Sequence, residues 1–250
     1  MKSLKNIEAI LLSAGRGKRM RYKTKYIAKP LVKVLQKPML EINLNYLSSL
    51  GIKNCIINNC YKNKTIDSFI KNYSYKNKFP IITSSFEEKR LETGGGIKNA
   101  LHLFRNDYIL AINGDSLLVH HKNYCPVTEL YKRFEKEKMS VLLLLASIKD
   151  TIGYKGNGDF IMQSKSSTFK IKRKNNNNNE GLVFTGWQII KKDLFKKISE
   201  RKFSLNLLYD LAENHNGLYG TKINGNFLHA STPKSLIQIE KFINENKYKL

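Results

Sequence analysis

Two glycines and a series of cations follow the first apolar run of the chain. The run ends at Ala14, and Gly15 and Gly17 come directly after it, interleaved with Lys and Arg. Glycine lets backbone approach a ligand closely, and the N–H groups of such a turn can bind an anion. Met20 stands where a dinucleotide-binding G-x-G-x-x-G motif has its third glycine, and the phosphate-loop pattern is also absent. The segment predicts a different kind of phosphate-binding turn, with an ordinary turn as the alternative.

Three further segments join glycines or polar residues to the end of an apolar run. In AINGDSL, Asp115 follows a strand-like run, where a carboxylate suits Mg²⁺ bound together with phosphate oxygens; a plain Asn-Gly-Asp turn is the alternative. In LETGGGI (91–97), three glycines open a predicted helix, which is costly unless the backbone must lie against another group. In FLHASTPKSL (227–236), a strand end leads into a capped helix.

Strand-like and helical stretches alternate through the first 150 residues. Apolar runs rich in β-branched residues predict strands, and a spacing such as Leu40, Leu44 and Leu47 predicts a helix with one apolar face. The predicted strands cover 7–13, 53–59, 79–84, 107–113 and 140–147, and the predicted helices cover 37–50, 62–72, 95–104 and 127–138. This alternation predicts an α/β fold: a Rossmann-like, mostly parallel, doubly wound sheet with helices on both faces.

The pattern changes after residue 150. Short strand-like runs and turns predict a small mixed or antiparallel subregion in the second half of the chain. Helical spacing returns at 204–214 and 233–246, where Thr232 and Pro233 supply a cap and a first-turn proline. The asparagine run at 175–179 predicts a surface loop.

The chain carries a large excess of positive charge, with 44 Lys and Arg against 20 Asp and Glu and a formal net charge of +24. A charge of that size attracts polyanions. The cations do not gather in one block, however, and Lys is abundant throughout, which favours a biased composition. Nucleic-acid binding has only this charge in its favour, because no recognisable module or basic face with interleaved aromatic residues accompanies it.

Cysteine usage and hydropathy indicate the compartment. Cys55, Cys60 and Cys125 are odd in number and lack Cys-x-x-Cys spacing, which argues against a disulfide framework or a structural zinc site. The first apolar run is short, contains Glu8 and leads into glycines and cations, unlike a secretion signal. No run approaches the roughly 18 apolar residues of a membrane span. We therefore expect a cytoplasmic protein without membrane contact.

Taken in order, these segments resemble the sugar-1-phosphate nucleotidyltransferase family. The family's opening signature, L-x-x-G-x-G-x-R-[ML] followed by Lys-Pro, is matched by Leu12, Gly15, Gly17, Arg19, Met20 and Lys29-Pro30. The segments ETGGG, NGD, GNGDF and FTGWQII continue the resemblance along nearly the whole chain. The short length, LETGGGI and GNGDF make the chain most similar to the branch of bacterial N-acetylmuramate 1-phosphate uridylyltransferases and small mannose-1-phosphate guanylyltransferases.

The chemistry of nucleotidyl transfer explains why glycines and cations would stand together. A sugar-phosphate oxygen attacks the α-phosphorus of a nucleoside triphosphate, and pyrophosphate leaves. The second pKa of a phosphate monoester is about 6, so the nucleophile is already anionic and needs no general base. Catalysis should therefore consist of positioning and of cations placed where charge accumulates.

The resemblance and this chemistry together imply a role for individual residues. The expected catalytic residues are Arg19 at the leaving phosphates and Lys29 at the α-phosphate. The expected nucleotide contacts are Ala14, Gly15, Gly17, Lys18, Arg19, Gly94 and Asn113. The expected sugar-phosphate contacts are Glu92, Asp159, Lys174 and Thr185, with a plain surface lysine as the alternative for Lys174. The expected metal ligands are Asp115 and His229, and the cofactor is Mg²⁺ or Mn²⁺.

The resemblance also implies a single domain over residues 1–250 and leaves the oligomeric state open. Residues 1–150 would form the nucleotide-binding half, residues 151–230 the sugar-binding half, and residues 231–250 a C-terminal helix.

One position departs from the family pattern. The family has a second metal-binding Asp in a pattern like W-x-D-[VI]-G-T-P, and this chain has His229 in its place. Neutral imidazole is a poor substitute, because Mg²⁺ prefers oxygen ligands. Three alternatives follow: Asp115 with phosphate and water suffices, a softer metal such as Mn²⁺ is used, or activity is impaired.

The expected function is the synthesis of a nucleotide-sugar from a nucleoside triphosphate and a sugar 1-phosphate. The preferred pair is UTP with N-acetylmuramate 1-phosphate, for cell-wall recycling. The alternatives are a mannose-1-phosphate guanylyltransferase and a catalytically weakened nucleotide-sugar-binding module, which His229 would explain.

Overall fold

The structure is a computed structural model that describes residues 4–163, 166–174, 181–248 and 250. The asparagine run at 175–179, expected to be a surface loop, lies outside the described residues.

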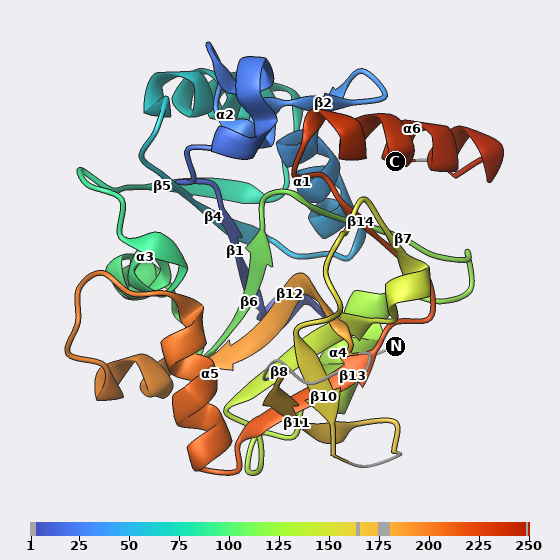
Figure 1. The fold of residues 1–250 in the computed structure, drawn as a ribbon. Helices are drawn as coiled ribbons and strands as arrows, with labels where there is room; N and C mark the ends of the chain where they lie inside the picture. Colours follow the sequence, from blue (N-terminus) through green and yellow to red (C-terminus); the bar gives the residue numbers. More distant parts are fainter. Residues whose placement is uncertain (1–3, 164–165, 175–180, 249) are drawn as a thin grey trace.

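Nine strands form one large sheet through the centre of the molecule (Figure 1). Their order across the sheet is β10-β11-β13-β8-β12-β6-β1-β4-β5. The strands are β1 (Glu8–Leu12), β4 (Asn54–Asn59), β5 (Ile81–Phe86), β6 (Tyr108–Asn113), β8 (Val141–Ala146), β10 (Phe160–Met162), β11 (Phe169–Arg173), β12 (Val183–Lys191) and β13 (Leu218–Lys222). Each of the five strands predicted in the first 150 residues is present.

Most strands of this sheet point the same way. β5, β4, β1 and β6 are joined by parallel pairing, as are β8 and β13. Only β11 and β12 run against the other seven strands. The predicted mostly parallel sheet is confirmed, and four strands of the second half, β10 to β13, extend it.

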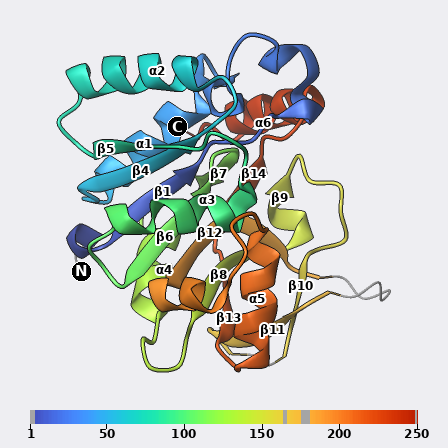
Figure 2. The same cartoon turned by 90° about the vertical axis from the view of Figure 1, so that its left-hand side faces the viewer.

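Helices cover both faces of the sheet (Figure 2). Successive side chains of a strand point to opposite faces, so that Leu11 packs in the core beneath α1, α2 and α4, whereas Ile10 packs in the core beneath α3 and α5. The helices are α1 (Met39–Ser49), α2 (Asn63–Lys76), α3 (Glu92–Ala100), α4 (Pro126–Arg133), α5 (Leu205–Asn214) and α6 (Pro233–Glu245). The doubly wound arrangement that the sequence predicted is confirmed.

A second, smaller sheet supports α6 beside the main one. It consists of β7 (Ser116–Val119), β14 (Asn226–His229) and β9 (Thr151–Ile152), with β14 antiparallel to β7 and parallel to β9. A separate apolar core joins it to α6 and to the glycine-cation segment, through residues such as Met20, Leu228 and Ile239. This is the expected small mixed sheet, but it takes β7 from the first half of the chain.

The short elements lie mainly in the loops. They are the 3₁₀ turns η1 (Leu4–Asn6), η2 (Lys18–Thr24), η3 (Lys29–Leu31), η4 (Leu101–Leu103), η5 (Ile148–Asp150) and η6 (Lys192–Lys197), and the hairpin of β2 (Lys33–Val34) and β3 (Lys37–Pro38). Among the described residues, no helix has the length and apolar character needed to cross a lipid bilayer.

Trp187, the single tryptophan of the chain, lies on β12 in the centre of the core. It is fully buried, and its ring packs edge-on against the Tyr46 ring, with 5.7 Å between the ring centroids. Its indole N–H has no hydrogen-bond partner among the described residues. The ring therefore contributes through packing, while its buried N–H carries a desolvation cost.

We predict that Trp187→Phe costs less than about 1.5 kcal/mol of unfolding free energy, because it removes the unpaired N–H together with part of the ring. Trp187→Ala should cost about 3–5 kcal/mol, because it leaves a cavity. Urea denaturation followed by circular dichroism measures both. Equal losses in the two variants would contradict this account of Trp187.

Candidate functional site

The order of the strands places a crevice between β1 and β6. From β1 the chain runs outward to β4 and β5 and then returns to β6 on the other side of β1. Ligands of α/β sheets bind at such a reversal, beyond the carboxyl ends of the strands. A pocket of about 370 Å³ lies there.

Loops that follow the strands line this pocket. Leu12, Ser13, Ala14 and Gly15 follow β1, while Asn113, Gly114 and Asp115 follow β6. Lys29, Pro30, Asn58, Arg90, Glu92, Thr93 and Ser204 complete the lining. Six of the expected site residues therefore meet in one pocket: Ala14, Gly15, Lys29, Glu92, Asn113 and Asp115.

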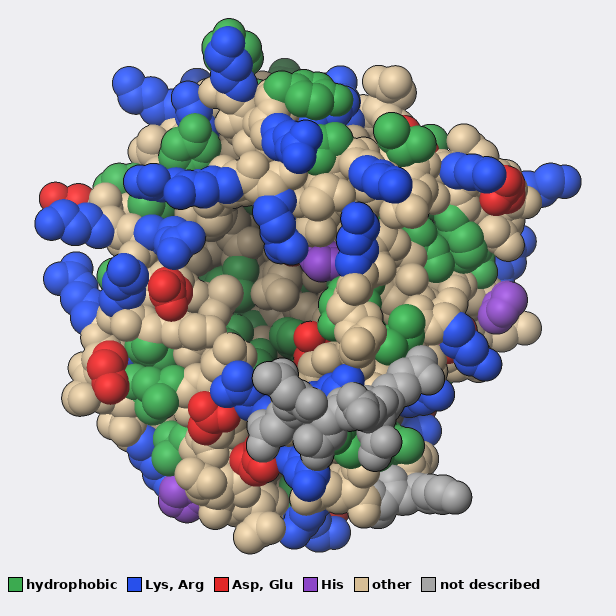
Figure 3. Space-filling model, in the orientation of Figure 1, with side chains coloured by type: hydrophobic (Ala, Val, Ile, Leu, Met, Phe, Trp, Pro, Cys, Tyr) green, Lys and Arg blue, Asp and Glu red, His purple; other side chains and the backbone are tan. Residues whose placement is uncertain are grey.

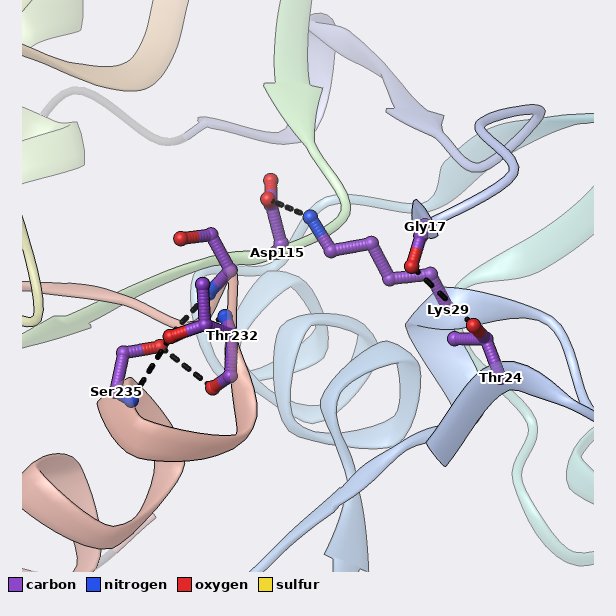
Figure 4. Close-up of polar contacts among 7 residues, drawn as sticks. Gly17, Thr24, Lys29, Asp115, Thr232 and Ser235 are labelled. Carbon is purple, nitrogen blue, oxygen red and sulfur yellow. Dashed lines mark hydrogen bonds and ion pairs between the residues drawn. The ribbon is translucent and has the colours of Figure 1, made fainter. Parts of the chain in front are cut away.

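Gly17 allows Lys29 to reach the pocket. Its φ of +61° is left-handed, and a Cβ at this position would lie 2.8 Å from the Cβ of Lys29. The Thr24 hydroxyl donates a hydrogen bond of 3.2 Å to the Gly17 carbonyl, which closes η2 beside the lysine stem (Figure 4). Only glycine fits both the backbone angle and the close approach.

Lys29 and Asp115 form an ion pair at the pocket wall (Figure 4). Their side chains are 15% and 18% exposed, so both charges are largely removed from water. Burial opposes ionisation of Asp115, but the charge and the hydrogen bond of the Lys29 ammonium outweigh it and hold the pKa of that carboxyl below its usual range. The site therefore presents the Lys29 ammonium beside a carboxylate that is ionised at neutral pH.

His229 lies next to Asp115 across two strands. β14 pairs with β7 so that His229 is opposite Ser116, and the Ala230 N–H donates to the Asp115 carbonyl at 3.2 Å. Burial is the main reason that the pKa of His229 lies below its usual value, so the imidazole is neutral at neutral pH. Its Nδ1 is buried and, within the described part of the chain, has no hydrogen-bond partner.

Of the two expected metal ligands, only Asp115 suits Mg²⁺. Nowhere in the described residues do three or more His, Cys, Asp or Glu side chains gather as a metal cluster. Mg²⁺ is commonly held by one or two carboxylates together with substrate phosphates. Asp115 can serve as that carboxylate, whereas His229 offers nitrogen instead of the oxygen that Mg²⁺ prefers.

Arg19 lies outside the main pocket, in a neighbouring one. That pocket, of about 300 Å³, is lined by Arg19, His229, Tyr154 and the first turn of α6, among others. Thr232 and Ser235 cap this turn reciprocally, and Figure 4 shows the cap on the opposite side of Asp115 from Lys29. Arg19 is exposed, and Lys18 is exposed in a third depression with other cations.

The residues expected to bind the sugar are spread over different surroundings. Asp159 is exposed and accepts hydrogen bonds from the Tyr154 hydroxyl (3.1 Å) and the Phe184 N–H (2.8 Å). Thr185 is fully buried, and its hydroxyl donates to the Leu144 carbonyl at 2.8 Å. The Lys174 ammonium donates to the Asn157 carbonyl at 2.8 Å. None of the three lines the main pocket, and their contact with a sugar stays a prediction.

Close packing accounts for the three glycines of α3. A Cβ at Gly94 would lie 2.3 Å from the Phe203 ring, and one at Gly95 would lie 2.5 Å from the Arg201 carbonyl oxygen. The N–H groups of Gly94 and Gly95 both donate to the Phe203 carbonyl, at 3.0 and 3.1 Å. Gly94 is buried and does not line the pocket, so the glycines are explained without a nucleotide base against them.

Several pocket residues were not predicted as site residues, among them Asn58, Arg90 and Ser204, and neither was the buried Glu87. Asn58 stands at the carboxyl end of a predicted strand, a position that could have identified it. Arg90 and Glu87 lie in a polar loop whose side chains give no periodic pattern.

Positively charged side chains gather near a hollow on one face of the molecule. Figure 3 shows a hollow at its centre, with Lys and Arg side chains gathered above and beside it and fewer acidic ones below. Such a surface draws anionic ligands toward the hollow.

Comparison with known proteins identifies the class of this site. A family model described as nucleotidyl transferase matches residues 8–158, and the chain belongs to that family. This family, together with relatives named for transfer to a sugar 1-phosphate, confirms the resemblance to sugar-1-phosphate nucleotidyltransferases, and the chain is an enzyme of this class.

Individual relatives cover most of the chain. It is 28% identical over 233 residues to the N-acetylmuramate alpha-1-phosphate uridylyltransferase of Caulobacter vibrioides, with 93% of this chain and 95% of the relative aligned. It is 31% identical over 204 residues to the D-glycero-alpha-D-manno-heptose 1-phosphate guanylyltransferase of Aneurinibacillus thermoaerophilus, with 79% and 81% aligned.

A solved structure supports the fold. HddC from Yersinia pseudotuberculosis, complexed with GMP-PN, superposes with a TM-score of 0.73 at 21% identity, covering 94% of this chain and 99% of HddC.

We predict that Gly95→Ala destabilises the protein by about 1–3 kcal/mol, because its Cβ would meet a backbone carbonyl. In an unhindered helix the same change stabilises by about 1 kcal/mol. Gly15→Ala is the control for thermal stability, since a Cβ there meets nothing within 4 Å. A rise in melting temperature for Gly95→Ala would contradict the packing account.

Proposed function

We propose that this enzyme joins UTP to N-acetylmuramate 1-phosphate, giving the nucleotide-sugar and pyrophosphate. The uridylyltransferase of Caulobacter vibrioides supports this pair, because it aligns with nearly the whole chain. The reaction type is supported by the family and by the shared chemistry of the relatives, which are named for nucleotidyl transfer to a sugar 1-phosphate.

The single observation that carries the proposal is the Lys29–Asp115 pair at the reversal of strand order. The two charges come from the loops after β1 and β6, and both face the pocket. Two anionic substrates must meet in this reaction, and their repulsion is the main barrier that fixed charges can lower.

The residues of the chain would act by position and charge. The open backbone at Gly15 and the wall from Ser13 to Ala14 accept the nucleotide, and Asn113 borders the same space. As the triphosphate arrives, the Lys29 ammonium exchanges the Asp115 carboxylate for an α-phosphate oxygen and neutralises charge there during attack. The sugar phosphate is deprotonated at neutral pH, so no side chain has to remove a proton.

Mg²⁺, when bound at Asp115 together with phosphate oxygens, would supply further neutralisation of the phosphate charge. Arg19, which lines the neighbouring pocket, would hold the leaving pyrophosphate. Residues 1–150 would bind the nucleotide and residues 151–230 the sugar, since the strands of both halves join one sheet around the crevice.

A guanylyl donor is the second candidate. It is favoured by the 31% identity to a heptose 1-phosphate guanylyltransferase and by the likeness to HddC, which was solved with GMP-PN. Both candidates use the same charges around the α-phosphate and differ only in the contacts to base and sugar.

Pyrophosphate release measured with UTP and GTP against a panel of sugar 1-phosphates tests the proposal. We expect turnover with UTP and N-acetylmuramate 1-phosphate, and we expect Asp115→Asn to lower kcat/KM at least a hundredfold, the size of effect seen when a charge-stabilising group is lost. Asp193→Asn is the matched control, because its carboxylate is 81% exposed and remote from the pocket. Turnover with GTP alone would favour the second candidate, and no turnover with any pair would overturn both.

The role of His229 is tested separately. If one carboxylate suffices, the wild-type enzyme turns over readily and His229→Asp changes kcat/KM by less than about tenfold, or about 1.4 kcal/mol. Steady-state kinetics with Mg²⁺ and with Mn²⁺ measures this. A wild-type rate near zero that His229→Asp raises by orders of magnitude would instead show a weakened binding module.

A further inference from the structure

A buried carboxylate, that of Glu87, lies next to the pocket-lining residue Asn58. Glu87 is 2% exposed and follows β5 directly. Its Oε1 accepts a hydrogen bond of 2.7 Å from the Asn58 side chain, and its Oε2 accepts one of 2.9 Å from the Leu91 backbone N–H. It is not part of the pocket lining, so the reaction derived above gives it no role.

The network that includes Glu87 has only one consistent arrangement of donors and acceptors. The Ser13 N–H donates to Asn58 Oδ1 at 2.7 Å. A backbone N–H can only donate, so Asn58 must direct its NH₂ group toward Glu87. Leu91 also donates, and an ionised carboxylate satisfies both donors at once. Burial raises the pKa of Glu87, and the two hydrogen bonds counteract that shift.

This network connects two walls of the pocket. At one end Ser13 lies where the chain leaves β1, just before the open backbone at Gly15. At the other end Leu91 precedes Glu92, which lines the pocket with a left-handed φ of +65°. A non-glycine residue holds such an angle only when its surroundings impose it.

Gly96 shows how closely α3 packs on the same network. A Cβ at this position would lie 2.5 Å from the Asn58 amide nitrogen and 2.6 Å from Glu87 Oε1. The third glycine of LETGGGI is therefore required by the buried Asn58–Glu87 pair.

We propose that Glu87 is a positioning residue of the nucleotide site, which holds the loop after β1 and the start of α3 in the geometry that the nucleotide requires. The inference rests on the proposed function for the identity of the ligand. Its structural part, the coupling of Ser13 to Leu91 through Asn58, is testable without any ligand.

Glu87→Gln keeps the shape of the side chain and replaces one acceptor with a donor. Every orientation of the two amides at 58 and 87 then leaves at least one pair of donors facing each other. Glu88→Gln is the matched control: Glu88 is exposed, and it has no hydrogen bond or ion pair with a described residue.

Amide hydrogen exchange in the ligand-free protein is the first measurement. For Glu87→Gln we expect the amides of Ser13 and Leu91 to exchange at least tenfold faster, while those of central strand β6 keep their wild-type rates. A general loss of stability would speed exchange in β6 as well. Wild-type rates at both amides would overturn the proposal.

Calorimetric binding of UTP and GTP is the second measurement. We expect Glu87→Gln to weaken the binding of the wild type's nucleotide by about tenfold or more, and Glu88→Gln to leave that affinity unchanged. In steady-state kinetics, Glu87→Gln should change KM more than kcat. If the wild type binds neither nucleotide, the proposed function fails. If the wild type binds and Glu87→Gln binds equally well, this inference fails.

A double variant tests the role of this hydrogen-bond network even if Glu87→Gln does not fold. Glu87→Gln with Asn58→Asp restores every donor–acceptor pair of the network at the same total charge. We expect it to fold and to recover slow exchange at Ser13 and Leu91. Nucleotide affinity is not its readout, because residue 58 lines the pocket. A double variant no better than the single one would overturn the proposal.

Discussion

The ammonium of Lys29 and the carboxylate of Asp115 meet where two loops of the sheet converge, and the rest of the site is arranged around them. Each loop has a glycine that permits the approach: Gly17 beneath the lysine stem, and Gly114, where a Cβ would lie 2.7 Å from the Leu12 carbonyl. A largely buried ion pair is sensitive to geometry, because desolvation cancels much of its attraction. Under the proposed function, this sensitivity would let Lys29 exchange Asp115 for a phosphate oxygen when the nucleotide binds.

Buried hydrogen bonds hold the loops that carry these charges and line the pocket. The pocket walls are loops, which by themselves define no geometry, and buried polar side chains attach them to the sheet. The Asn58 side chain accepts a hydrogen bond from the Ser13 N–H, and the Glu87 carboxylate accepts one from the Leu91 N–H. The large sheet provides the rigid base for these attachments, and α6 with the small sheet closes the other side of the site at His229.

Local patterns in the sequence predict much of this fold. The strands and helices of the first half follow from apolar periodicity, and Asp115 follows from its place after an apolar run. Lys29 was expected from the family signature and from the chemistry of nucleotidyl transfer. β12 was not predicted as one strand, because Gly186, with φ of +82°, and a bulge interrupt it. The glycines of α3 show a different limit: their partners Arg201 and Phe203 lie about a hundred residues further along the chain. Long-range contacts of this kind leave no mark on local spacing.

The central claim is that Lys29 exchanges its partner when nucleotide binds. A crystal structure with Mg²⁺ and hydrolysis-resistant analogues of UTP and GTP tests it most directly. The account predicts that the Lys29 ammonium leaves Asp115 for an α-phosphate oxygen, within hydrogen-bond distance, in whichever complex forms. A nucleotide bound with its phosphates remote from both side chains, and with the ion pair intact, would contradict it.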